Sequence, residues 1–110
     1  MSRRIPRVNQ LIKKELSQIL LKESDFPQNT LVTITRVETS PDLEQTRVYI
    51  SVIPFSSRAL QMLNKKNHSL QALLNKRLKM KKIPRIKFEE EKETARAARI
   101  EELLEKIHTK

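Results

Sequence analysis

The sequence predicts an α+β fold whose elements follow in the order helix, strand, strand, helix, helix, strand, with a further helical segment at the C-terminus. Two observations carry this prediction. Apolar residues recur every three or four positions in some segments, as they do on the buried face of a helix. Other segments are β-branched or alternate between apolar and polar residues, as strands do. The 110 residues suit a single domain, with a core over about residues 3–89 and the helical segment over about residues 93–108.

The first part of the chain predicts a helix followed by a β-hairpin. Residues 4–22 carry Ile, Val and Leu at helical spacing. Residues 31–37 are rich in β-branched side chains, and residues 46–53 alternate between an apolar face and a wetter face that includes Arg47. Between these strands, residues 39–42 read Thr-Ser-Pro-Asp, which is typical of a turn and makes Asp42 a turn residue. The short link predicts antiparallel pairing.

The next part of the chain predicts two consecutive helices. The first is expected to begin near Arg58, where Ser56 or Ser57 can cap it. A polar run interrupts its apolar stripe, and Ser69 can cap the second helix. The stripe of that second helix is expected to contain four leucines: Leu70, Leu73, Leu74 and Leu78.

A third strand is predicted after Pro84, because proline disfavours helical geometry in the residue before it and alternation follows through Phe88. Farther on, residues 97–107 carry an amphipathic helical stripe. Agreement among these patterns predicts one core built from ten residues: Ile12, Leu16, Ile19, Ile34, Val48, Ile50, Leu63, Leu74, Leu78 and Phe88.

The composition excludes several classes of function. The chain has no glycine, so it cannot carry the glycine-rich loops that hold phosphates or dinucleotides. It has no cysteine, which excludes disulfides and thiolate chemistry. Its histidines, His68 and His108, lack partners at metal-ligand spacing. We therefore expect no enzyme, no cofactor, no metal site and no small-molecule substrate.

No part of the sequence resembles a membrane anchor or a secretory signal. Apolar runs stay far below the roughly 20 residues of a membrane span, and the first residues lack an apolar segment. We therefore expect a cytoplasmic protein. Peripheral membrane binding through the first helix is a weaker alternative, which liposome flotation would test.

The positive charge is concentrated in one stretch of the chain. The net charge is +10, and residues 58–87 contain ten Lys and Arg but no acidic residue. Such a block favours a polyanionic partner, because lysines and arginines that neutralise phosphates release counterions. With aromatic residues at only 4%, recognition of RNA shape and backbone is favoured over base stacking. The alternative is an ordinary solvated surface.

The residues expected to contact RNA lie mainly around the last predicted helix and strand. This set consists of Lys65, Lys66, Lys76, Arg77, Lys79, Lys81, Lys82, Arg85 and Lys87. A weaker set lies near the start of the first helix, at Arg3, Arg4 and Arg7.

The sequence also resembles a known family. The stretch from Val32 to Leu43, followed by residues 47–52, is similar to the valine- and threonine-rich hairpin with a Ser-x-Asp-Leu turn found in the ribosome-binding factor A family. Residues 73–78 with Pro84 resemble its third helix and the approach to its last strand.

The resemblance implies a type II KH-like fold, with three helices on one face of a three-stranded sheet. It further implies a monomer that binds immature small ribosomal subunits through precursor ribosomal RNA. The implied role is to assist late maturation and processing of that RNA, without catalysis. A permanent ribosomal protein, or a general module for structured RNA, is the alternative.

The chain departs from the family at the kink between its last two helices. The family has Ala-x-Gly there, whereas the matching positions are Lys66, Asn67 and His68. This leaves the geometry of the kink open. Asn67 is a candidate for a left-handed backbone conformation, which asparagine tolerates better than other residues except glycine.

Overall fold

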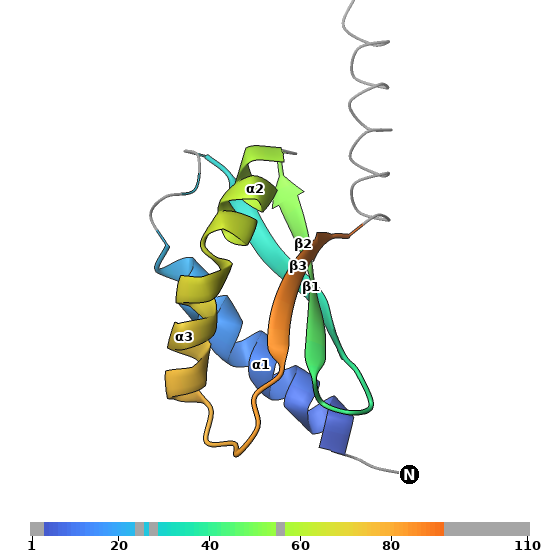
Figure 1. Ribbon diagram of the computed structural model, residues 1–110. Helices are drawn as coiled ribbons and strands as arrows, with labels where there is room; N and C mark the ends of the chain where they lie inside the picture. The colour runs from blue at the N-terminus through green and yellow to red at the C-terminus, as the bar shows by residue number, and fades with distance from the viewer. Residues whose placement is uncertain (1–3, 24–25, 27–28, 55–56, 92–110) are drawn as a thin grey trace, which may run out of the picture.

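The computed structural model describes residues 4–23, 26, 29–54 and 57–91. Its elements have the predicted order: α1 (Arg4–Leu21), β1 (Leu31–Thr39), β2 (Gln45–Ile53), α2 (Ser57–Lys65), α3 (Asn67–Arg77) and β3 (Arg85–Glu90) (Figure 1). The predicted C-terminal helix, the candidate contact Arg3 and the candidate cap Ser56 lie outside the described residues.

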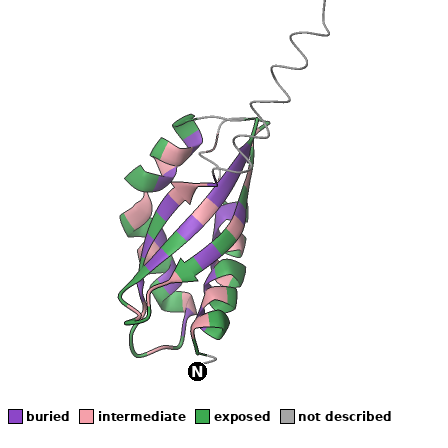
Figure 2. Cartoon of the chain, turned by 90° about the vertical axis from the view of Figure 1, so that its right-hand side faces the viewer, coloured by how far each residue is buried: buried purple, intermediate pink, exposed green. Residues whose placement is uncertain are grey.

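One three-stranded sheet organises the domain, in the order β1-β2-β3. Strands β1 and β2 are antiparallel, as predicted, whereas β3 runs parallel to β2. The three helices cover one face of the sheet and leave the other face open (Figures 1 and 2). This is the architecture that the resemblance implies.

The core lies between the helices and the covered face of the sheet. All ten residues predicted to form it are buried. Leu73 shares the helical spacing but is not one of the ten; it is 46% exposed, although Leu70 and Leu74 in the same helix are buried. Within the described ranges, no helix combines the length and the hydropathy that a membrane span requires.

The hairpin turn is stabilised by side-chain hydrogen bonds. The Ser40 hydroxyl donates to Asp42 Oδ1 at 2.6 Å, and the Glu44 N–H donates to the same oxygen at 3.0 Å. These two bonds, Ser40 first, lower the pKa of the Asp42 carboxyl. Leu43 accepts a positive φ of 61° within the turn. The prediction of Asp42 as a turn residue is confirmed.

The kink between α2 and α3 needs no left-handed residue. Lys66 has φ −94° and ψ 6°, a region that ordinary residues can adopt. Among the described residues, positive φ occurs at Asn29 and Leu43 and not at Asn67, so the left-handed prediction for Asn67 is wrong. The cap prediction for Ser69 is also wrong, because α3 already begins at Asn67.

Two side chains of α3 bind the outer edge of β3. Asn67 Nδ2 donates to the Ile86 carbonyl at 3.0 Å, and the Ile86 N–H donates to Gln71 Oε1 at 2.8 Å. Gln71 Nε2 also donates to the Pro84 carbonyl at 3.1 Å. Because β3 is an edge strand, these bonds satisfy backbone groups that no neighbouring strand reaches.

Candidate nucleic-acid interface

Exposed lysines gather where α3 ends and the chain turns back into β3. We call Lys76, Lys79, Lys81, Lys82 and Arg85 the basic end; all five are exposed. The loop is held against the hairpin turn, because the Arg85 N–H donates to the Glu44 carbonyl at 3.0 Å. Lys82 also pairs with the Glu44 carboxylate.

Most of the basic end carries uncompensated charge. Within the described part of the chain, no carboxylate pairs with Lys76, Lys79, Lys81 or Arg85. Exposed cations without a carboxylate partner are available to an external anion. A cluster of this kind suits the phosphates of RNA, which it would bind with little dependence on sequence.

Arg77 has a different environment from the lysines that follow it. Its guanidinium donates to Glu15 Oε2 at 3.3 Å and to Gln18 Oε1 at 3.1 Å, both on α1. Its side chain is only 31% exposed. Arg77 therefore joins α3 to α1, and contact between Arg77 and RNA stays a prediction.

Lys65 and Lys66 lie apart from the basic end. They occupy the α2–α3 junction, and the 11 residues of α3 separate them from the loop by about 16 Å. Lys66 Nζ pairs with Glu23 Oε1 at 3.0 Å. The structure thus divides the predicted basic block into two surfaces.

The start of α1 lies at the same end of the molecule as the α3–β3 loop (Figures 1 and 2). Thr39 Oγ1, at the end of β1, donates to Asn9 Oδ1 at 2.5 Å and so fixes this part of α1 against the hairpin. Arg4 and Arg7 are exposed there and border a shallow groove with Val8 and Leu11. Contact between RNA and Arg4 or Arg7 stays a prediction.

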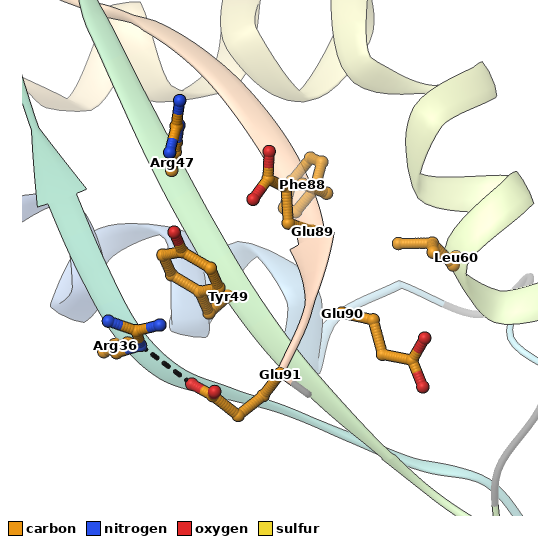
Figure 3. A pocket seen from close by; sticks show the side chains of 8 residues that line it. All are labelled: Arg36, Arg47, Tyr49, Leu60, Phe88, Glu89, Glu90 and Glu91. Atoms are coloured by element: carbon orange, nitrogen blue, oxygen red, sulfur yellow. Dashed lines mark hydrogen bonds and ion pairs between the residues drawn. The ribbon is translucent and has the colours of Figure 1, made fainter. Parts of the chain in front are cut away.

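The open face of the sheet carries a network of polar side chains (Figure 3). The Arg36 guanidinium lies 3.9 Å from the centroid of the Tyr49 ring, and its Nε donates to Glu91 Oε2 at 2.9 Å. The hydroxyls of Thr35 and Tyr49 donate to Glu91 and Glu38 at 3.0 and 3.2 Å. These groups satisfy one another, and the bond to Glu91 raises the pKa of Arg36.

The described residues include no arrangement of side chains that suits catalysis or base stacking. No group of three or more histidine or acidic side chains there is placed to hold a metal ion. Phe88 is buried, and Arg36 covers the Tyr49 ring.

Sequence reasoning missed two features of this surface. Arg47 and Lys87 are direct neighbours across β2 and β3, and both are exposed on the open face. The alternation of each strand places its charged residues on one face, but no pattern in the sequence reveals which residues of two strands are paired. The anchoring role of Gln71 was missed for the same reason.

Comparison with known proteins agrees with the resemblance. The family model described as ribosome-binding factor A matches residues 4–104. The ribosome-binding factor A of Latilactobacillus sakei is 36% identical, and the match covers 98% of this chain and 95% of that protein.

Solved structures of the same kind share the fold. The crystal structure of ribosome-binding factor A from Thermus thermophilus matches with a TM-score of 0.70 and 25% identity, over 77% of this chain and 92% of that one. A Thermus thermophilus homology model fitted into a cryo-electron-microscopy map of a 30S–RbfA complex matches with a TM-score of 0.63 and 26% identity, over 74% and 88% of the two chains. With the hairpin, the helices and the last strand all matched, this chain belongs to the ribosome-binding factor A family.

Proposed function

We propose that this protein is a ribosome assembly factor that binds immature small ribosomal subunits through their ribosomal RNA. It assists the late maturation and processing of that RNA and catalyses no reaction. The observation that carries the proposal is the family match over residues 4–104. A fitted structure of a relative in a 30S–RbfA complex supports the choice of partner. The proposal includes a cytoplasmic location, where small subunits are assembled, and action as a monomer.

The basic end supplies the physical means of binding. Its lysines would neutralise phosphates, and the affinity would then fall steeply as salt rises. A binder without catalytic groups can favour maturation only by binding one RNA arrangement more tightly than another. Each 1.4 kcal/mol of that preference changes the ratio of the two occupancies about tenfold.

A salt series on paired variants tests the RNA contact. Lys79→Gln with Lys81→Gln should weaken binding to precursor small-subunit RNA and lower the slope of log affinity against log salt. The control is Lys22→Gln with Arg58→Gln, because both residues are exposed and lie away from the basic end. The two substitutions remove as much positive charge as Lys79→Gln with Lys81→Gln. Equal slopes for the two double variants would show that the basic end does not bind RNA.

Gradient sedimentation tests the assembly role. The protein should travel with free or precursor small subunits and be depleted from joined ribosomes. Stoichiometric occupancy of joined ribosomes would instead support the alternative, a permanent ribosomal protein.

A further inference from the structure

A row of three cations crosses the open face of the sheet. Arg47 on β2 and Lys87 on β3 are paired in register, and Arg85 precedes Lys87 by two residues on the same strand. Side chains two apart in a strand share a face, and all three residues alternate with buried neighbours. They therefore lie on the face opposite the core, which is the face that no helix covers (Figure 2). All three are exposed.

This row carries a cost that packing within the domain does not explain. Like charges directly opposite each other in adjacent strands repel. Lys87 is 74% exposed in its side chain, and its partner carboxylate, Glu89, is distant at 3.9 Å. Arg47 lies near Tyr49, whose hydrogen bond raises the pKa of Arg47, and the charges of Glu89 and Glu38 raise it further. The two cations are therefore adjacent, and Glu89 is the carboxylate that lies near both of them.

The row continues the basic end along the sheet. Arg85 belongs to both, since it is the first residue of β3 and follows the loop that carries Lys81 and Lys82. Farther along the same face lie Glu89 and Glu91, which pair with Lys87 and Arg36. The three cations of the row thus form a band that begins at the loop and ends at this mixed cluster of cations and carboxylates.

We propose that Arg85, Lys87 and Arg47 bind RNA backbone phosphates on the open face of the sheet, so that the bound RNA extends from the basic end onto the strands. The site takes phosphates and not bases, because the Tyr49 ring is covered by Arg36. Glu89 lies at the end of the row, where its carboxylate would disfavour a phosphate. This inference rests on the proposed function and adds a surface to it.

A set of charge-matched double variants tests the sheet surface on precursor small-subunit RNA. Arg47→Gln with Lys87→Gln should lower the salt slope by about 1.4 to 1.8, which corresponds to 0.7–0.9 for each lost phosphate contact. The control is again Lys22→Gln with Arg58→Gln, whose slope should match that of the unaltered protein. The unfolding midpoint should stay unchanged or rise, because a repulsive pair has been removed.

A further variant should change RNA affinity in the opposite direction, and it removes an acidic residue instead of a cation. Glu89→Gln removes the carboxylate nearest Lys87 and should tighten RNA binding and steepen the salt slope.

The proposal is overturned if the Arg47 and Lys87 double variant keeps the slope and affinity of the control, or if Glu89→Gln weakens binding. If the Lys79 and Lys81 variant weakens binding while the sheet variant does not, the sheet surface fails and the proposed function stands. If neither variant weakens binding, both fail.

Discussion

At the scale of single residues, Leu73 and Leu74 show how strongly burial depends on position around one helix. Both belong to α3 and both fit its three-and-four spacing, yet Leu74 is fully buried and Leu73 is 46% exposed. The ten predicted core residues are buried because each lies on the face that its element turns toward the core. Spacing alone could not separate Leu73 from them, since it gives a stripe and not the part of the stripe that a neighbour covers.

Truncation of these two leucines should therefore have very different effects. Leu74→Ala should lower the free energy of unfolding by about 2–5 kcal/mol, because it removes buried apolar atoms and leaves a cavity. Leu73→Ala is the matched control and should change it by no more than about 0.5 kcal/mol. Denaturant unfolding measures both. Similar losses for the two variants would contradict the packing of α3.

Asp42 gives a prediction about pH. Hydrogen bonds from Ser40 and from the Glu44 N–H lower its pKa below the ordinary value of 3.8 in the folded state. A carboxyl with a lowered folded-state pKa stabilises the fold above its unfolded pKa, and the contribution is lost as the pH falls through the folded pKa. The unfolding midpoint of the unaltered protein should exceed that of Asp42→Asn near neutral pH.

The difference between these two proteins should shrink as the pH falls below about 3.8. The two proteins differ at residue 42 alone, so the comparison isolates Asp42. Thermal unfolding followed by circular dichroism at a series of pH values provides the measurement. A difference that stays constant down to the lowest pH would rule out a role for the ionised carboxylate in the turn.

At the scale of elements, side chains of α3 bind the outer edge of the sheet at β3. Asn67 and Gln71 are one helical turn apart, and together they bind the N–H and the carbonyl of Ile86. The family's glycine at the kink is dispensable here, because Lys66 takes a backbone conformation that needs no glycine. The sequence indicated the kink and the strand, but it could not indicate these bonds, which depend on how the helix is placed beside the strand.

Removal of the Asn67 side chain tests this junction. Asn67→Ala should lower the free energy of unfolding by about 1 kcal/mol, the typical contribution of one hydrogen bond. His68→Ala is the control, because His68 is the exposed neighbour in the same helical turn. Amide hydrogen exchange should also become faster across β3 in Asn67→Ala, relative to exchange in β1. Unchanged exchange in β3 would argue against an anchoring role.

At the scale of the whole molecule, the tertiary structure determines which charged residues lie together, and their distance along the sequence does not. Residues 58–87 form one basic block in the sequence, but α3 separates Lys65 and Lys66 from the basic end, and Arg77 is directed to α1. Arg47, from a mostly acidic part of the chain, joins the cations instead. The net charge and its segregation along the sequence therefore predicted the class of partner. Which cations lie together on the sheet could be known only from the pairing of β2 with β3.

Loss of the protein should affect the particle that it binds. Cells that lack it should accumulate precursor small-subunit RNA, most clearly in the cold, because misfolded RNA rearranges slowly at low temperature. The defect should be restored by the unaltered protein and not by the Lys79→Gln, Lys81→Gln variant at equal abundance. Precursor RNA is measured by primer extension or blotting. Full rescue by that variant would separate RNA binding at the basic end from the biological role.

The position of β3 along the chain has a consequence for the timing of folding. A chain is synthesised from its N-terminus, and β1, β2 and the three helices all precede Arg85. Until residues 85–90 emerge, β2 lacks its parallel neighbour, and Arg47 has neither Arg85 nor Lys87 beside it. The row of three cations is therefore complete only after the last strand of the sheet has been synthesised.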